Sequence, residues 1–320
     1  MDVAEDQVIV HTRSKEGNSA VAVLSCRTTL LKAWISALRP HHWSKNVLIF
    51  MPLLLSHELQ PWRLLASAQA FFTFSWCASM FYVLNDLLDR EADRMHPRKA
   101  KRPLACGDLN TEQGLLLLVA CAVLTIALAW SLPFSARIVL LLYAVTNLGY
   151  SVGLKQIVFL DVLVLTLFYN FRLLFAGAAE HIDVSYWTLA FSAFLFLGLA
   201  LIKRWTELLS MSECNGVRLA RRGYLLSDMS TVRSFAEWSL YLSVVVLALY
   251  INSMAASKLY RHPQVLWLVC LLLFVWVRRV TVVTNKGLMT DDPVLFAFKD
   301  NGSQAIALLV AVSGALAIGL

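Results

Sequence analysis

The stretch from residue 85 to residue 103, NDLLDREADRMHPRKAKRP, places acidic and basic side chains directly after an apolar run long enough to cross a membrane. Charge beside lipid is costly, so a chain that carries it there usually needs it for function. We expect the helix of the apolar run to continue to His96, because Pro97 disfavours further helix. At about 100° per residue, one quarter of this helix surface would carry an amide and three carboxylates: Asn85, Asp86, Asp89 and Asp93.

Oxygen ligands in such a group suit a hard divalent cation. Mg²⁺ in particular is usually held by one or two carboxylates together with substrate phosphates. The turn-rich stretch that follows supplies Arg98, Lys99, Lys101 and Arg102, which could neutralise the remaining phosphate charge. Two simpler interpretations stay open: a solvated helix end that pairs Asp with Arg four residues apart, and basic residues that only hold the loop in the cytoplasm. We favour the metal interpretation because of the spacing, the membrane edge and the basic stretch together.

The elements that must position this site are membrane helices. Of the 320 residues 58% are apolar, more than the 45–50% of a typical soluble domain, and a span needs about 20 mostly apolar residues. The sequence therefore predicts an all-α integral membrane protein with one domain at 31–320, preceded by a poorly ordered polar tail at 1–30. The nine predicted spans are 46–57, 64–84, 113–131, 134–153, 157–179, 185–202, 236–256, 264–282 and 303–320. The first of them is too short to cross alone.

The distribution of the net charge of +7 indicates the orientation of the protein in the membrane more directly than it indicates a binding partner. With nine spans and a cytoplasmic N-terminus, 23 of the 28 Lys and Arg residues fall on the cytoplasmic side and four on the other side, a strong positive-inside asymmetry. We therefore expect no nucleic acid partner. The six cysteines are scattered without metal-ligand spacing, so we expect neither a disulfide nor a zinc site. No cleavable signal peptide is expected in residues 1–30.

The pattern NDxxDxxxDxxHPxKxxRP resembles the first aspartate-rich motif of the UbiA superfamily of intramembrane prenyltransferases. The resemblance extends from LRPHHWSKNVLIF (38–50) to DDPVLFAFKDNGS (291–303). It implies nine helices around a central cavity, with Mg²⁺ and a diphosphate held at the motif. It also implies that Asn85, Asp86, Asp89 and Asp93 are the metal ligands.

The region after the sixth span separates branches of that family. Most members carry a second motif of DxxxD type there, whereas this chain has LIKRWTELLSMSECNGVRLARRGY (201–224), in which only Glu207 and Glu213 are acidic. The run KRxxEL, together with YSxGLK at 150–155 and Asp161, resembles the decaprenyl-phosphate phosphoribosyltransferase branch. Such enzymes transfer 5-phosphoribose from phosphoribosyl diphosphate to a polyprenyl phosphate. One acidic cluster and a second, basic one would fit the two charged ends of that donor.

The resemblance implies separate roles for the site residues. The leaving diphosphate would be stabilised by Mg²⁺ on the acidic motif, with Lys99 and Arg102 assisting. The 5-phosphate or the lipid phosphate would be bound by Lys155, Lys203 and Arg204, and Tyr150 belongs to the same substrate-binding set. We group Asp161 with the catalytic carboxylates of the motif, although Asp161 and Glu207 are better suited to orienting cations or bonding ribose hydroxyls than to acting as bases.

Three further positions have two interpretations each. Arg172 lies in mid-span and should face the cavity, where it would bind a substrate phosphate or pair with a carboxylate such as Asp161. Lys45 resembles a first-helix lysine that faces the site, but it could also extend its ammonium to the membrane interface. His41 and His42 resemble an interfacial belt more than metal ligands.

Two other functions remain open at this stage. A prenyltransferase that joins a prenyl diphosphate to an aromatic or other acceptor is the first, and the missing second acidic motif counts against it. A transporter for an anionic metabolite is the second, and the acidic face counts against it. Neither the length of the lipid nor the oligomeric state follows from the sequence.

Overall fold

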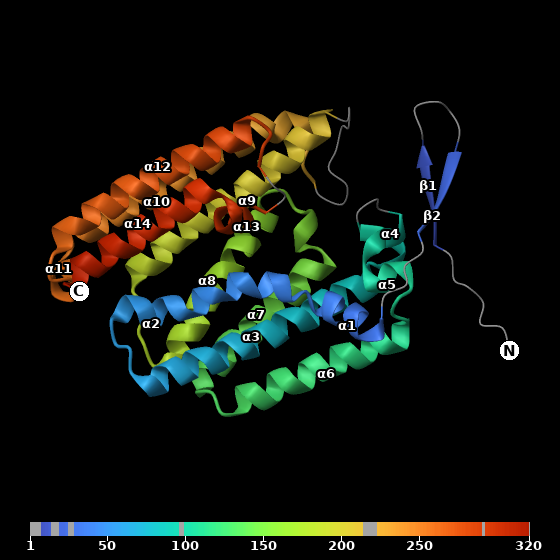
Figure 1. Ribbon diagram of the computed structural model, residues 1–320, viewed down its shortest axis with the longest axis horizontal. Coiled ribbons are helices and arrows are strands. Elements are labelled where there is room, and N and C mark those ends of the chain that lie inside the picture. Colours follow the sequence, from blue (N-terminus) through green and yellow to red (C-terminus); the bar gives the residue numbers. More distant parts are fainter. Residues whose placement is uncertain are drawn as a thin grey trace.

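The computed structural model describes residues 8–13, 19–24, 29–95, 99–213, 223–289 and 292–319, and Figure 1 shows its ribbon. The strands are β1 (Val8–Arg13) and β2 (Ser19–Leu24). The α-helices are α1 (Leu30–Leu38), α2 (Met51–Ser56), α3 (Pro61–Leu88), α4 (Arg90–Arg94), α5 (Pro103–Cys106), α6 (Thr111–Trp130), α7 (Phe134–Val152), α8 (Leu160–Glu180), α9 (Tyr186–Glu213), α10 (Met229–Ile251), α11 (Met254–Leu259), α12 (Leu266–Asn285), α13 (Pro293–Lys299) and α14 (Asn301–Ile318). The 3₁₀ helices are η1 (Pro40–Phe50), η2 (Lys99–Lys101), η3 (Leu154–Gln156), η4 (Leu226–Asp228) and η5 (Pro263–Val265).

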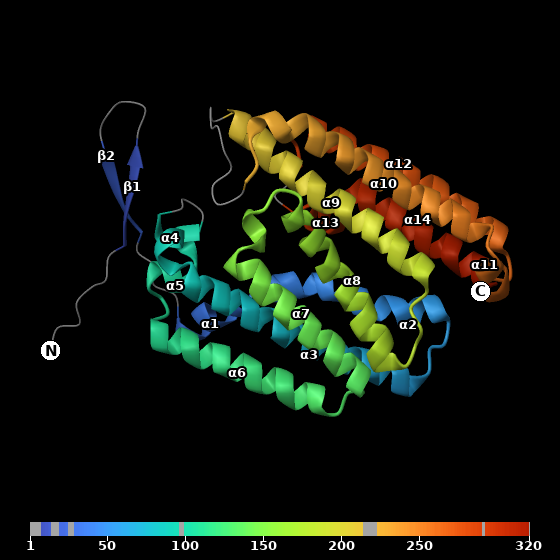
Figure 2. The ribbon, with the colours of Figure 1, turned by 180° about the vertical axis from the view of Figure 1, so that it is seen from behind.

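The long helices form two groups that follow the order of the chain. In Figure 1, α3, α6 and α7 lie in one group and α9, α10, α12 and α14 lie in the other. Helix α8 packs against α3 and α7 of the first group and against α9 of the second, and Figure 2 shows it at this junction from behind. Helix α8 therefore joins the two groups.

Eight of the described helices are long and apolar enough to cross a membrane. These helices differ in how far the rest of the protein covers them. In the apolar stretch of each helix, 50% of the residues of α3 and 56% of those of α8 are buried, against 17% for α14. Outer helices can leave apolar side chains exposed because lipid covers them. The prediction of an integral membrane protein therefore agrees with the structure, and α3 and α8 are the helices placed to carry an internal site.

The predicted count of nine spanning helices is not confirmed, because the expected first span at 46–57 is not one helix. Instead α1, η1 and α2 follow one another: Arg39, with φ +52°, separates α1 from η1, and η1 passes directly into α2 after Phe50. This segment runs antiparallel to α3: the side chain of Arg39 contacts Asp86, whereas that of Asn46 contacts Ser75, nearer the start of α3. A span is found in a sequence as one uninterrupted apolar stretch of about 20 residues. This segment is divided among three short helices and offers no such stretch.

The predicted continuous helix through His96 is also corrected. Helix α3 ends at Leu88, and Asp89 adopts φ −96° and ψ 6° before α4 begins at Arg90. The N–H of Asp93 still donates to the carbonyl of Asp89 at 2.8 Å, so the break changes the direction of the chain without ending the turn. His96, Pro97 and Arg98 lie outside the described residues.

The N-terminal segment, expected to be a poorly ordered tail, contains the two strands. They pair antiparallel, with Val8 opposite Leu24 and Arg13 opposite Ser19. Figure 1 shows this hairpin beside the end of the helical body that carries α4 and α5. The all-α class thus describes the membrane body, and the hairpin is an addition to it.

Candidate active site

The acidic end of α3 is held by two arginines. One guanidinium nitrogen of Arg39 donates to both carboxylate oxygens of Asp86, at 2.6 and 2.7 Å. A nitrogen of Arg102 donates to Asp86 at 3.0 Å and to Asp93 at 2.5 Å. Asp86 and Asp93 are both almost fully buried, so their charges require these partners. The structure thus brings Asp86, Asp93 and Arg102 together, as the sequence predicts, although the helix between the two aspartates is broken.

Two lysines complete this group. The ammonium of Lys99 lies 3.8 Å from Asp93, and that of Lys155 lies 3.5 Å from Asp89. Lys155 belongs to η3, between α7 and α8, so its contact with Asp89 joins a distant loop to the motif. All three aspartates of the motif therefore face a cation. We call Asp86, Asp89, Asp93, Arg39, Arg102, Lys99 and Lys155 the acidic-motif cluster.

A second charged group lies between α8 and α9 and is centred on Arg204. The Nε of Arg204 lies 2.8 Å from Oδ2 of Asp161, and another nitrogen of the guanidinium pairs with Glu207. The side chains of Arg204 and Asp161 are both 0% exposed. The phenol of Tyr224 donates to Oδ1 of Asp161 at 2.7 Å. Arg204, predicted to bind a phosphate, is thus enclosed among protein partners in this structure, with Asp161 and Glu207 orienting it.

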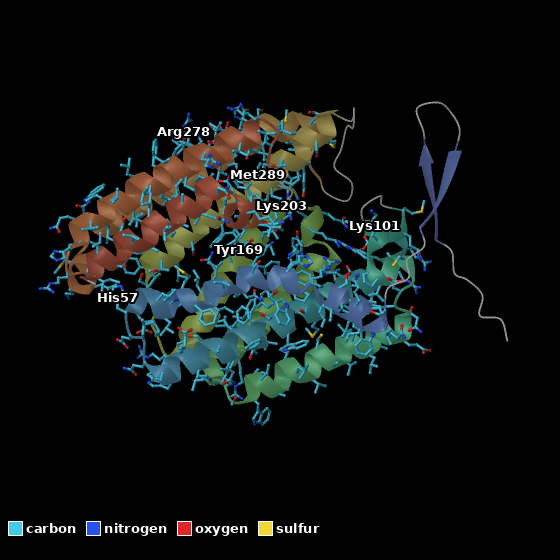
Figure 3. All side chains as sticks on the ribbon, in the orientation of Figure 1. His57, Lys101, Tyr169, Lys203, Arg278 and Met289 are labelled. Carbon is cyan, nitrogen blue, oxygen red and sulfur yellow. The ribbon has the colours of Figure 1, made fainter. Side chains whose placement is uncertain are left out.

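A third group brings Lys45 and Asp292 together across the chain. Their side chains form an ion pair although 247 residues separate them. Burial raises the pKa of the Asp292 carboxyl, but the charge of Lys45, its hydrogen bond and the charge of Lys203 together leave that pKa below its usual value. Lys45 therefore points to the interior of the protein and not to the membrane interface. Figure 3 shows Lys203 and Tyr169 in the interior as well, between the two groups of helices.

Lys203 differs from its neighbour Arg204 in its surroundings. Its side chain is half-buried, and within the described residues no hydrogen bond or ion pair joins its ammonium to another side chain. The charges that act on it are those of Arg204, Glu207, Lys45 and Asp292. Lys203 is thus an interior cation available to an anionic ligand.

Arg172 is buried, as expected for a mid-span arginine, but the suggested pairing with Asp161 is wrong. Both residues are on α8, and eleven residues at about 1.5 Å each separate them by roughly 16 Å. The Nε of Arg172 donates instead to the side-chain oxygen of Asn46 at 2.8 Å. Its guanidinium also stacks near the rings of Phe74 and Tyr169, at 5.0 and 5.3 Å from their centres. Arg172 therefore ties α8 to η1 and α3.

Two predicted residues have less defined roles. The ring of Tyr150 lies 5.7 Å from that of Phe168, and the charges of Arg204, Asp161 and Glu207 act on its hydroxyl. Asn85 is half-buried, and its backbone carbonyl accepts from the N–H of Asp89 at 2.9 Å. Tyr150 thus lies beside the Arg204 group, and Asn85 lies at the break that ends α3.

Sequence reasoning missed three residues of these groups: Arg39, Asp292 and Tyr224. Arg39 and Asp292 lie inside the two stretches that carry the family resemblance, and each directly precedes a proline. Arg39 has φ +52° and ends α1, whereas Asp292 caps α13 by accepting from the N–H groups of Val294 and Leu295. A charged residue before a proline at a helix boundary was the available signal. Tyr224 follows the basic stretch and had no such signal.

The acidic-motif cluster fits Mg²⁺ by its chemistry. Its three carboxylates offer the oxygen ligands that this ion prefers, and each is now neutralised by Arg or Lys. Within the described residues no three His, Cys, Asp or Glu side chains converge on one point. Arg102 bridges Asp86 and Asp93, and Lys155 lies against Asp89. A Mg²⁺–diphosphate would bring both a cation for the aspartates and an anion for the displaced guanidinium and ammonium groups.

The family can now be decided by comparison. The family model described as "UbiA prenyltransferase family" matches residues 47–299, which include the acidic motif, the Arg204 group and Asp292. The chain belongs to the UbiA prenyltransferase family. Its α3, α8 and α9 therefore carry the charged groups of a UbiA protein.

Curated relatives of this UbiA protein fall under different names. The uncharacterized protein y4nM of Sinorhizobium fredii is 31% identical over 98% of this chain, and the chain spans only 61% of that protein's length. The nodulation protein NoeC of Azorhizobium caulinodans is 33% identical over 90% of this chain and 92% of its own. The decaprenyl-phosphate phosphoribosyltransferase of Mycobacterium tuberculosis is 30% identical over 91% of this chain and 96% of its own.

Among solved structures, a UbiA homolog from Archaeoglobus fulgidus bound to GPP and Mg²⁺ matches with a TM-score of 0.65 at 15% identity. The match covers 90% of this chain and all of that one. A digeranylgeranylglyceryl phosphate synthase matches with a TM-score of 0.62 at 17% identity. At such identities the likeness shows the fold alone.

Proposed function

We propose that this protein transfers 5-phosphoribose from phosphoribosyl diphosphate to the phosphate of a polyprenyl phosphate, with release of diphosphate. Relatives about 30% identical over most of the chain carry the name of this activity. The chemistry also fits two charged regions of unlike composition. The acidic-motif cluster would hold a metal-bound diphosphate, and the cations around Lys203 would hold a phosphate without metal.

The observation that carries the proposal is that the acidic side chains around α9 pair with an arginine of the protein. Most family members resemble one another in a second DxxxD motif here, which suits a second metal. In this chain Glu207 and Asp161 both contact Arg204, so a cation of the protein itself neutralises the acidic side chains there. Lys203, without a partner of its own among the described residues, faces the interior. A phosphate is the ligand that such a site favours.

At the acidic-motif cluster we propose that Asp86, Asp89 and Asp93, assisted by Asn85, hold Mg²⁺. The ion would supply charge stabilisation for the departing diphosphate. Arg102 lies within 4 Å of Asp86 and Asp93, and Lys99 within 4 Å of Asp93, so both are placed to share the negative charge of that leaving group. Lys155 would do the same from the opposite loop.

At the other end of the donor we propose that Lys203 binds the ribose 5-phosphate, with Lys45 nearby. Arg204, the next residue of α9, is fixed by Asp161 and Glu207, so Lys203 and not Arg204 is the cation left for the phosphate. The acceptor needs no dedicated base, since a lipid phosphate with a second pKa of about 6 is largely ionised at neutral pH. Its oxygen attacks the anomeric carbon as the diphosphate leaves from the opposite side, which inverts that centre.

A second candidate is prenyl transfer from a prenyl diphosphate, favoured by the fold shared with the homolog bound to GPP and Mg²⁺. A prenyl diphosphate has one charged end, so it would leave the cations around Lys203 without a ligand. This difference makes the phosphoribosyl reaction the better account of the site.

The proposal is tested with purified protein in detergent and a donor labelled in the ribose. We expect label to pass into the lipid phase only when polyprenyl phosphate and Mg²⁺ are both present. A panel of polyprenyl phosphates of different length would then define the acceptor. Label that stays in the aqueous phase under all conditions would defeat the proposal.

A further inference from the structure

Tyr224 links the two loops that border the charged groups. Its phenol oxygen accepts from the backbone N–H of Phe159 at 2.9 Å and donates to Oδ1 of Asp161 at 2.7 Å. The other oxygen of Asp161 lies 2.8 Å from Nε of Arg204. A chain of contacts therefore runs from the loop before α8, through one buried phenol, to the guanidinium on α9.

Each end of this chain of contacts lies next to a cation of the proposed site. Phe159 ends the short loop that begins with η3, and η3 carries Lys155, which reaches Asp89 of the acidic motif. Arg204 directly follows Lys203 in α9. The phenol of Tyr224 thus contacts both the loop that carries Lys155 and the carboxylate that pairs with Arg204.

The backbone of this loop needs such a support. Phe159 has φ +63°. This conformation is unfavourable for any residue other than glycine, so contacts from the surrounding structure must hold it. The residue directly before Tyr224 also approaches this loop very closely. A Cβ on Gly223 would lie 2.7 Å from the side chain of Val158 and 2.9 Å from the carbonyl of Gln156. Gly223 thereby allows Tyr224 to reach the loop.

Tyr224 is suited to this contact because it stays neutral. Its side chain is fully buried, and burial, followed by its hydrogen bond and charge interaction with Asp161, raises the pKa of the phenol above its usual value. The hydroxyl therefore keeps its proton and donates it in a hydrogen bond at all ordinary pH values.

We propose that Tyr224 is a positioning residue: its hydroxyl fixes the loop from Gly153 to Phe159 so that Lys155 faces Asp89, and the same hydroxyl holds Asp161 against Arg204. Its role in turnover rests on the proposed function, but its effect on Lys155 does not. Tyr224 touches no reacting atom in this arrangement. It acts through Lys155.

The test uses inorganic diphosphate with Mg²⁺ as the probe, because the acidic-motif cluster should bind it whatever the donor is. Dissociation constants are measured by calorimetry for wild type, Tyr224→Phe, Lys155→Ala and the double variant. We expect Tyr224→Phe to weaken binding about 3–10-fold, the scale of one hydrogen bond. Because Tyr224 acts through Lys155, the double variant should bind no more than about twofold weaker than Lys155→Ala alone.

Tyr241→Phe is the matched control, since Tyr241 packs in α10 without a hydrogen bond among the described contacts of the site, and its binding should equal that of wild type. Hydrogen exchange provides a second readout: the amides of 156–160 should exchange faster in Tyr224→Phe. If Tyr224→Phe cannot be purified, Gly223→Ala tests the same contact and should weaken binding in the same way.

The inference is overturned if Tyr224→Phe binds Mg²⁺–diphosphate like wild type. It is also overturned if the loss of affinity in the double variant equals the product of the losses in the two single variants. A wild-type protein that binds Mg²⁺–diphosphate but does not consume phosphoribosyl diphosphate would defeat the proposed function alone. Absence of diphosphate binding in wild type would overturn both.

Discussion

At the scale of single residues, the charges of the site are paired across large distances in the chain. Asp86 with Arg39, Asp89 with Lys155 and Lys45 with Asp292 each join separate elements. Buried charges are tolerated only with such partners, so most cations and carboxylates here serve the fold in the absence of substrate. The side chains that can also bind substrate are the ones that are only partly buried.

Asp89 is the aspartate of the motif whose loss the fold should tolerate best. Its side chain is 25% exposed, against 4% for Asp86 and 2% for Asp93. We predict that Asp89→Asn lowers turnover at least about 100-fold, because the site needs its charge for metal and leaving group, while purification and thermal unfolding stay normal. Glu91→Gln, an exposed substitution on neighbouring α4, is the control. Normal Mg²⁺-dependent turnover in Asp89→Asn would contradict the metal assignment.

Lys203 and Arg204 are neighbours in α9 for which we predict opposite outcomes. A charge-assisted contact with a phosphate contributes about 1.5–3 kcal/mol, so Lys203→Ala should raise the KM for phosphoribosyl diphosphate about 10–100-fold without lowering the unfolding temperature. Arg204→Ala leaves Asp161 buried without its cation, and breaking a buried pair costs about 3–5 kcal/mol. Its main effect should therefore be a lower unfolding temperature.

Kinetics and thermal unfolding of both variants in the same detergent check this contrast, with Lys258→Ala on α11, outside the charged groups, as the control. A Lys203→Ala variant with unchanged KM would remove Lys203 from the 5-phosphate site. A stable Arg204→Ala variant with a raised KM would instead restore Arg204 as a direct phosphate contact.

The residue scale also shows what the sequence could predict. The aspartates, Lys99 and Arg102 come together as their spacing and charge predict. Lys155, which the sequence grouped with Lys203 and Arg204, lies instead against Asp89 of the motif, because the fold brings the loop before α8 to the end of α3. The partner of Arg172 could not be predicted, because Asn46 lies on an element 126 residues away and an amide gives no charge signal. The enclosure of Arg204 depends likewise on Tyr224 and Asp161, which only the fold brings together.

At the scale of elements, two breaks in regular helix shape the site. The change from α1 to η1 at Arg39 turns its guanidinium toward Asp86, and the break at Asp89 separates α3 from α4. Neither break contains a glycine, and no proline lies in the second, so composition gave no warning of it. Most ends of the long apolar helices, in contrast, could be placed from hydropathy to within about five residues. The exceptions are the end of α9, 11 residues beyond the predicted bound of 202, and the start of α10, seven residues before the predicted bound of 236.

The element η1 also makes stability depend on pH. His42 packs its ring 5.2 Å from that of Tyr82, and burial, followed by the charge of Lys45, lowers the pKa of His42 to about 3. The unfolded chain then binds a proton near pH 6.5 that the folded protein does not. The free energy of unfolding should therefore fall as the pH drops from about 6.5 toward 3.

We predict that this effect amounts to about 1 kcal/mol between pH 7 and pH 5, allowing for the partial exposure of the ring. Thermal unfolding at pH 7, 6 and 5 should show it as a loss of stability that is smaller in His42→Phe, which keeps the ring contact. An identical pH dependence in wild type and variant would contradict the assignment.

At the scale of the whole molecule, the charged groups lie on one side of the predicted topology. The loop from Asp89 to Asn110, the loop with η3, the end of α9 and the segment before α13 all carry site residues. The positive-inside asymmetry of the sequence predicts that these loops are cytoplasmic. A soluble donor would then enter from the cytosol while the lipid acceptor enters from the membrane.

Cysteine labelling checks this orientation. In a background without native cysteines, we predict that Asp183→Cys, at the exposed turn after α8, reacts with an impermeant thiol reagent in sealed cells. Asp108→Cys, in the loop before α6, should react only after the cells are opened. The reverse pattern would place the site on the outer face and exclude a cytosolic donor.

The central claim concerns the donor, and a competition between donors tests it most directly. The purified protein is incubated with Mg²⁺, a polyprenyl phosphate, an aromatic acceptor and equal concentrations of phosphoribosyl diphosphate and a prenyl diphosphate, and the extracted lipids are examined by mass spectrometry. We predict a polyprenyl phosphate heavier by one phosphoribosyl group, with diphosphate released in equal amount. A prenylated acceptor without any phosphoribosylated lipid would contradict the account.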